Sequence, residues 1–287
     1  MNHVFVSPHP DDIALSCGGL IARLRDAGED VTIVTVFCGA GSSDRLTRYQ
    51  QRALGFDREA DERGDPEPTE PAEANAPAPD SAPTPEQVMA VRRQEDEAFA
   101  RFVGATNVSL KLPDGVFRGY VGDPQLMRPP RPDDRPPVDE LRAALARLRV
   151  DRLYVPFSIG GHVDHRQTRR AAIALLNEAG SPYADRAVFF EDFPYAMTTG
   201  FERLDQLNPE ILSSLPAGAS VTPEYVEIEA VLDRKVDALR AYESQIGHLF
   251  RREGESVAES IRAHTTRIGE LGGVGPAERY WRISGGT

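Results

Sequence analysis

Two short segments of this 287-residue chain carry side chains that could bind a metal ion and activate water. The first is PHPDD at residues 8–12, and the second is SIGGHVDHRQ at residues 158–167. A histidine and a carboxylate three residues apart can converge on one ion where the chain turns, so His9 and Asp12 are candidate ligands. Asp11 lies between them and would be free to act on a water molecule. Two histidines and one carboxylate with an open position form a catalytic zinc site, so the second segment, with His162 and His165, would complete it.

Each segment also has a simpler interpretation. HPDD could be an Asx turn that caps a helix, and the HxxH pattern could be a solvated loop or the start of a helix. Both segments follow predicted strands, however, and the carboxyl ends of parallel strands meet at one edge of a sheet. That coincidence favours the metal site over two unrelated turns.

Predicted strands and helices alternate along most of the chain. Apolar and β-branched runs predict strands at residues 3–7, 31–37, 107–112, 151–157 and 187–191. Helical spacing predicts helices at 12–27, 87–103, 138–149 and 164–179, and in the last third at 225–246 and 256–271, after a loop at 193–223. This alternation is typical of a Rossmann-like α/β sandwich of three layers with a mostly parallel sheet.

Residues 57–86 interrupt the alternation. This segment holds seven prolines, ten acidic residues and only two arginines, and it has no aromatic residue. Such a composition predicts an exposed, disordered insertion that buries no core. A segment that docks a partner protein is the alternative. We therefore expect one domain over residues 1–287 that carries this insertion.

The composition excludes several classes of protein. A net charge of −12 disfavours binding to nucleic acid or to an anionic membrane surface, and no apolar run approaches the length of a membrane span. The two cysteines, Cys17 and Cys38, are too few for a disulfide framework, and the first residues lack the features of an export signal, so we expect a cytoplasmic protein. The absence of a GxGxxG pattern disfavours a nucleotide-binding oxidoreductase.

Taken together, the motifs resemble those of the PIG-L/LmbE family of zinc-dependent N-deacetylases. The resemblance is carried by HPDD, by CGG at 17–19 and by GGHVDHR at 160–166, and it covers nearly the whole chain apart from residues 57–86. Weaker echoes follow in the family's order: RRQE at 92–95, LPDG at 112–115, EDFPY at 191–195 and KVDALRAYESQ at 235–245.

The resemblance implies a role for each residue of the two main motifs. One zinc ion per chain would be held by His9, Asp12 and His165, Asp11 would be the general base, and His162 would polarise the carbonyl group of the substrate. Arg92 and Asp114 fall where the family contacts substrate hydroxyls or orders the site. The alternatives for this pair are a surface ion pair of Arg92 with Glu95 and a turn formed by Asp114. The chain departs from the family at Ile13, where a glutamate is common.

The implied reaction is hydrolysis of an N-acetyl or related N-acyl group on a small molecule or natural product that contains an amino sugar. Two alternatives stay open: an amidase that acts on a sugar–thiol conjugate, and an accessory protein that keeps the fold without turnover. The resemblance also leaves a homo-oligomer open.

Overall fold

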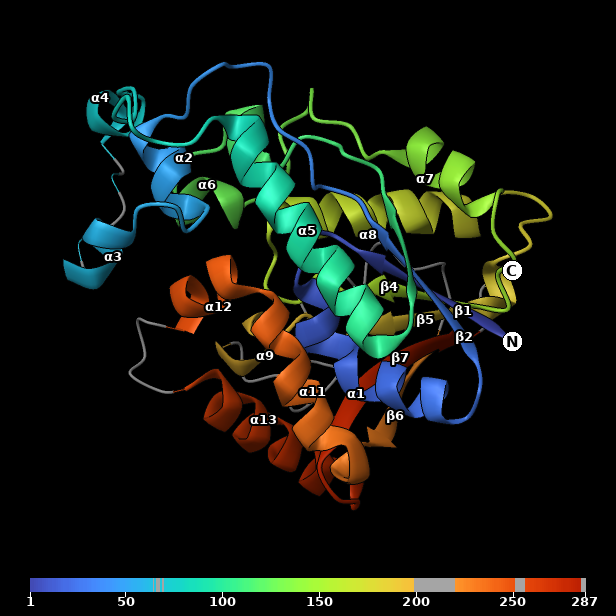
Figure 1. The fold of residues 1–287 in the computed structure, drawn as a ribbon. Coiled ribbons are helices and arrows are strands. Elements are labelled where there is room, and N and C mark those ends of the chain that lie inside the picture. Colours follow the sequence, from blue (N-terminus) through green and yellow to red (C-terminus); the bar gives the residue numbers. More distant parts are fainter. Residues whose placement is uncertain (64, 66–67, 69, 199–219, 251–255, 285–287) are drawn as a thin grey trace.

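A seven-stranded β-sheet, in the order β3-β2-β1-β4-β5-β7-β6, forms the centre of the molecule (Figure 1). The computed structural model describes residues 1–63, 65, 68, 70–198, 220–250 and 256–284. Five strands are parallel: β1 (Asn2–Ser7), β2 (Asp30–Thr35), β3 (Thr106–Ser109), β4 (Arg152–Pro156) and β5 (Ala187–Phe190). β7 (Ala277–Ser284) pairs antiparallel with β5, and β6 (Ser220–Glu227) pairs antiparallel with β7.

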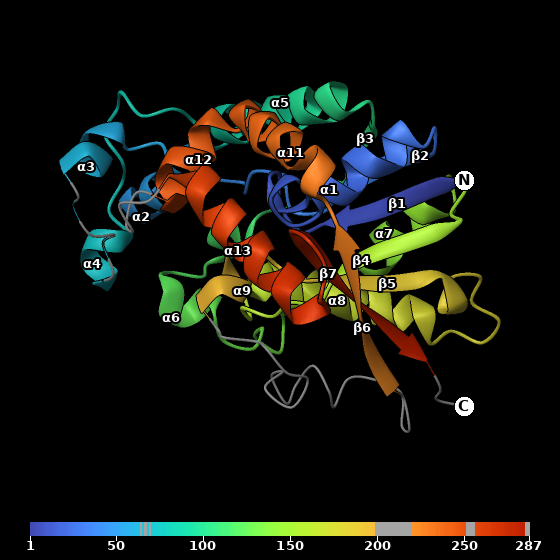
Figure 2. The same ribbon diagram turned by 90° about the horizontal axis from the view of Figure 1, so that it is seen from below.

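Helices cover both faces of the sheet (Figures 1 and 2). One face packs against α1 (Asp12–Asp26), α5 (Pro85–Val103), α11 (Leu232–Ala238) and α13 (Val257–Gly272). The other face packs against α7 (Val138–Leu145) and α8 (Val163–Leu176). Within β1 the side chain of Phe5 packs in the core on the α1 face, whereas those of Val4 and Val6 pack in the core on the α8 face. This follows from the alternation of side chains along a strand. The predicted three-layer α/β fold is confirmed.

Local sequence signals explain where the longer helices begin and end. Thr84 and Gln87 form a reciprocal capping box at the start of α5, and Ser256 and Glu259 form one at the start of α13. Both helices end at a glycine in the left-handed conformation, Gly104 with φ 73° and Gly273 with φ 67°.

The C-terminal third differs from the prediction in two respects. The helix predicted at 225–246 is a strand at its start, since β6 continues to Glu227, and it is then divided into α11, a short 3-10 turn and α12 (Glu243–Phe250). The prediction also omitted β6 and β7. In β6 half of the residues are exposed and half are partly buried, without clean alternation, so the strand has no buried face of its own. Of the loop predicted at 193–223, residues 199–219 lie outside the described part, and α9 (Tyr195–Thr198) occupies its start.

The acidic segment 57–86 is folded over much of its described length. It contains α3 (Arg58–Arg63) and α4 (Pro71–Ala74), and it follows α2 (Arg48–Ala53). Ala74 and Ala78 are 0% and 3% exposed and belong to a third apolar cluster, so the expectation that this segment buries no core is wrong at these positions. Alanine is small enough to pack where polar neighbours face solvent, which a composition count misses. The assignment of one domain stays a prediction.

The strand order places the two motif-bearing loops side by side. β1 pairs in parallel with β4, so the loops that follow these two strands leave the same edge of the sheet next to each other. Among the described residues, no helix is both long and apolar enough to cross a bilayer.

Candidate metal centre and active site

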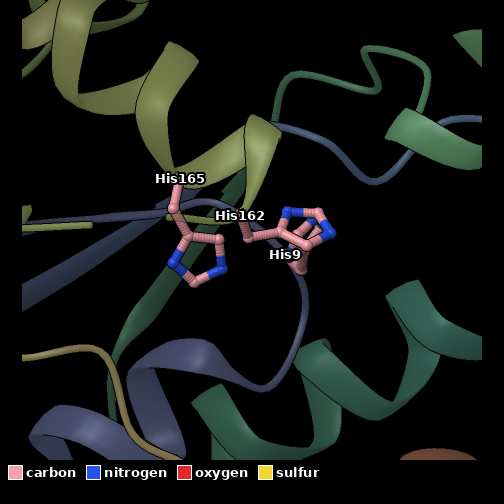
Figure 3. A group of neighbouring side chains, drawn as sticks. All are labelled: His9, His162 and His165. Atoms are coloured by element: carbon pink, nitrogen blue, oxygen red, sulfur yellow. The ribbon is translucent and has the colours of Figure 1, made fainter. Parts of the chain in front are cut away.

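Three histidines converge at this edge of the sheet (Figure 3). His9 follows β1, whereas His162 and His165 come from the loop after β4 and the first turn of α8. One ring nitrogen from each lies within 4.8 Å of the others, and all three residues are buried. The predicted pairing of the two loops is therefore present in the structure.

Asp12 lies between two of these histidines. Its Oδ2 is 3.3 Å from His9 Nδ1 and 3.3 Å from His165 Nε2. Ligands of a tetrahedral ion with bonds of about 2.0–2.1 Å are separated by about 3.3 Å, so these two spacings match the edges of such a site. His165 Nε2 is buried and makes no hydrogen bond to another described residue. These two distances are compatible with a divalent metal ion held by two imidazoles and one carboxylate. Among the described residues, the sets of side chains that lie mutually within 4.8 Å are His9, His162 and His165, and separately His9, Asp114 and Asp164.

The charges around this cluster favour a cation. Burial opposes ionisation of Asp12, but the neighbouring His165 and His9 hold the pKa of its carboxyl group well below its usual range. Burial likewise lowers the pKa of His165, yet Asp12 and Asp192 together raise it to about 9. The buried carboxylates of the site therefore need positive charge nearby to stay ionised. A bound metal ion would supply that charge.

Two further carboxylates orient the histidine rings. His9 Nε2 lies 2.8 Å from Asp164 Oδ2, and His165 Nδ1 lies 2.5 Å from Asp192 Oδ1. Such contacts fix the tautomer and orientation of a metal-binding imidazole. Neither aspartate was predicted from the sequence to have a role. The available signals were the position of Asp164 between the two histidines of HVDH and the position of Asp192 directly after β5, at the same sheet edge.

Replacement of Asp192 should weaken metal binding. In Asp192→Asn the side chain keeps its volume, but it loses the charge that holds the proton on His165 Nδ1, so the metal affinity should fall about 10–100-fold. Competition with a chromophoric chelator measures this affinity. Asp185→Asn is the matched control, because Asp185 is exposed just before the same strand and should bind metal as the parent does. An unchanged affinity in Asp192→Asn would show that this contact does not support the metal ligand.

Asp11 has an unusual backbone conformation next to the cluster. Its φ is 102°, a region that residues other than glycine rarely adopt and that tends to occur at functional sites. Asp11 occupies the N-cap position of α1, but its side chain makes no capping hydrogen bond, so the Asx-turn alternative does not describe it. Burial raises the pKa of the Asp11 carboxyl group to about 7, with Asp12 adding to the rise and Arg92 opposing it.

His162 is held as a neutral imidazole. Its Nδ1 accepts a hydrogen bond from the backbone N–H of Asp164 at 3.2 Å, which places the ring proton on Nε2. Burial is the main cause that lowers the pKa of His162 to about 3. The ring is therefore suited to donate one hydrogen bond from Nε2 to an oxygen atom in the cavity.

Arg92 and Asp114 lie together beside these residues. Arg92 Nη1 is 3.3 Å from Asp114 Oδ2 and Arg92 Nη2 is 3.9 Å from Asp11 Oδ1. Glu95 instead accepts hydrogen bonds from Ser244, so the surface ion pair considered for Arg92 does not form. Asp114 does cap a turn, through the N–H of Val116, but its second oxygen faces the cluster, 3.7 Å from His9 Nε2.

One cavity connects the predicted residues. Six of the seven predicted residues line it: His9, Asp11, Asp12, Arg92, Asp114 and His162. The seventh, His165, contacts Asp12. The EDFPY run divides between two roles. Its Pro194 and Tyr195 line the cavity, whereas Glu191 is buried against Arg279 and Trp281 of β7. Ile13, the departure from the family pattern, is 2% exposed in the core and leaves the ligand set intact.

The chain is similar to a known family and to several known proteins. The family model described as GlcNAc-PI de-N-acetylase (PIG-L) matches residues 4–176. The 2'-N-acetylparomamine deacetylase of Streptomyces fradiae is 29% identical over 99% of this chain and 81% of the relative, and that of Niallia circulans is 26% identical over 97% and 89%. A structure of the zinc-inhibited form of teicoplanin deacetylase Orf2 has the same fold, with a TM-score of 0.69 and 20% identity over 99% of this chain and 98% of that one.

Proposed function

The chain belongs to the PIG-L family, and on that premise we propose that it is a metal-dependent deacetylase. It would remove an N-acetyl or related N-acyl group from a small molecule or natural product that contains an amino sugar. One observation carries the proposal: His9 Nδ1 and His165 Nε2 each lie 3.3 Å from Asp12 Oδ2, and Asp11 lines the same cavity. An accessory protein without turnover would have no use for the strained backbone of Asp11.

Zinc is the ion that suits this donor set best. Two imidazoles and one carboxylate with an open position are typical of catalytic zinc, and we expect one ion per chain. When bound, the ion would supply positive charge that polarises the amide carbonyl and makes water more acidic. His9, Asp12 and His165 would hold it, while Asp164 and Asp192 fix the two rings.

Asp11 would carry the proton during hydrolysis. Its carboxylate accepts a proton from the attacking water, whose oxygen forms the new bond to the carbonyl carbon. The pKa of about 7 allows the group to accept and release a proton near neutral pH. Asp11 then returns the proton to the amide nitrogen as the C–N bond breaks. The products are a free amine and a carboxylic acid, which loses its remaining proton to solvent.

His162 would stabilise the negative oxygen of the tetrahedral intermediate. Its Nε2–H is the free donor, since Nδ1 is occupied by the backbone N–H of Asp164. A preorganised donor aimed at a developing oxyanion is among the largest catalytic effects known in hydrolases. Because its pKa is lowered to about 3, His162 carries no second proton to give, which favours Asp11 over His162 as the acid for the leaving amine.

The nature of the relatives supports an amino-sugar substrate. Both curated relatives are named for an N-acetylated aminoglycoside, and we propose that Arg92 and Asp114 bind hydroxyl groups of the sugar. An amidase that acts on a sugar–thiol conjugate would use the same metal site and differ only in the rest of the pocket. We also propose a cytoplasmic location, since Cys17 and Cys38 are free and buried.

Removal of the metal tests the proposal directly. Dialysis against a chelator should abolish acetate release from 2'-N-acetylparomamine, and one equivalent of zinc should restore it. An assay of the released amine on N-acetylglucosamine, an N-acetylated glycopeptide and a sugar–thiol conjugate ranks the substrate classes, since every amide that is cleaved gives a free amine. Acetate release that survives complete removal of metal would overturn the metal-dependent mechanism, and a strong preference for the thiol conjugate would favour the alternative amidase.

A further inference from the structure

The active-site cavity has an apolar wall as well as its charged residues. Ala53, Leu54, Val116 and Leu126 line it beside the metal-binding residues. Leu54, Val116 and Leu126 belong to one apolar cluster, against which Ala53 packs. Leu54, Val116 and Leu126 are 2%, 5% and 7% exposed, and their packing in this cluster holds them in place.

This wall begins close to the metal-binding cluster. Asp114 Oδ2 lies 3.7 Å from His9 Nε2, and Asp114 Oδ1 accepts a hydrogen bond from the backbone N–H of Val116 at 3.1 Å. The lining of the cavity therefore changes from polar to apolar within one turn, since Asp114 and Val116 are only two residues apart. Val116 is therefore two residues from a side chain that approaches His9, so an apolar group at Val116 would lie close to the metal-binding cluster.

We propose that Leu54, Val116 and Leu126 form the subsite for the acyl chain and limit its length to that of an acetyl group. This inference rests on the proposed function. The acyl chain is bonded directly to the reacting carbonyl carbon and is apolar, whereas hydroxyl groups surround the amine side of an amino sugar. Apolar walls bind apolar groups, and charged side chains such as Arg92 suit the hydroxyls.

Leu54 is held in place from two directions. The Gln245 side chain of α12 donates a hydrogen bond to the carbonyl oxygen of Leu54 at 2.9 Å. The proline- and alanine-rich part of segment 57–86 also forms backbone hydrogen bonds with the start of α2 and the residues before it. The N–H of Ala78 donates to the carbonyl oxygen of Leu46, and the N–H of Arg48 donates to that of Ala76, both at 2.9 Å. With Ala74 packed in the same cluster, the inserted segment supports the wall of the subsite.

Alkyl hydroxamates test the subsite through binding alone. They chelate a metal ion and carry an acyl chain but no sugar. With the zinc-loaded protein, calorimetry should show tighter binding of acetohydroxamate than of butyrohydroxamate. Leu54→Ala should reduce this preference by about tenfold, since one or two methylene groups in an apolar pocket commonly change affinity by that much. Leu141→Ala is the matched control: it truncates an equally buried leucine in a different core, and it should keep the parental preference.

The outcomes separate the subsite from the reaction. An equal preference in the parent and in Leu54→Ala would overturn the acyl subsite and would assign the wall to the amine side of the substrate. Failure of either hydroxamate to bind the zinc-loaded protein would overturn it as well. If no amide is hydrolysed but the preference depends on Leu54, the subsite stands and the proposed deacetylase activity fails.

Discussion

Asp11→Asn should lower kcat by about 10²-fold or more while the protein keeps its metal. The substitution preserves the size of the side chain but removes its ability to accept a proton. The ligand positions belong to His9, Asp12 and His165, so the change leaves the donor set complete. Acetate release and metal analysis on the same preparation measure the two effects.

The pH dependence adds a second readout for the same residue. Burial raises the pKa of Asp11 to about 7, so a base at this position is protonated and inactive at lower pH, and kcat/KM should rise with pH through that region. The acidic limb should disappear from the residual activity of Asp11→Asn. Asp30→Asn, which removes an exposed carboxylate at the start of β2, should behave as the parent does. Full activity in Asp11→Asn would rule out its role as the base.

Periodicity and loop position were sufficient to predict the part of the fold that carries the chemistry. Buried parallel strands such as β1 and β2 read as apolar runs, and their helices show clear apolar stripes, so the alternation was visible. The position of His9 and His162 after two such strands then followed from topology alone. The antiparallel edge could not be predicted in this way, since the hydrogen-bond partners of β6 and β7 are set by packing against the finished sheet.

The partners of the ligands were beyond local sequence patterns. Asp192 and His165 are 27 residues apart along the chain and meet because β5 ends beside the start of α8. The position of Asp192 after a strand indicates the edge of the sheet but does not identify its partner. Arg92 was ambiguous for the opposite reason: a local partner, Glu95, was available at helical spacing. The long-range contacts with Asp114 and Asp11 prevailed because Arg92 faces the interior of the molecule.

The overall charge also has a local origin. Segment 57–86 contributes −8 of the net −12, so most of the acidity lies in the insertion and not around the cavity. Net charge is therefore a weak argument about the partners of this protein.

His165→Ala should abolish stoichiometric metal binding. Within the described residues, His165 Nε2 and His9 Nδ1 are the imidazole nitrogens at 3.3 Å from Asp12 Oδ2. A site reduced to one imidazole and one carboxylate loses most of its affinity for zinc. Elemental analysis after gel filtration should give far less than one equivalent per chain, and activity should fall with it. His165→Gln is the companion variant, since it retains a polar side chain between Asp12 and Asp192 and is less disruptive to folding.

His162→Ala is the matched comparison, because His162 is equally buried, lies three residues earlier and has a ring nitrogen within 4.8 Å of the other two histidines. Its Nδ1 is already engaged by the backbone N–H of Asp164, so we assign it to the substrate and not to the ion. His162→Ala should therefore keep one equivalent of metal and lose turnover by about 10²–10³-fold, the usual cost of a missing oxyanion donor. Metal loss in His162→Ala together with full metal content in His165→Ala would exchange the roles of the two histidines.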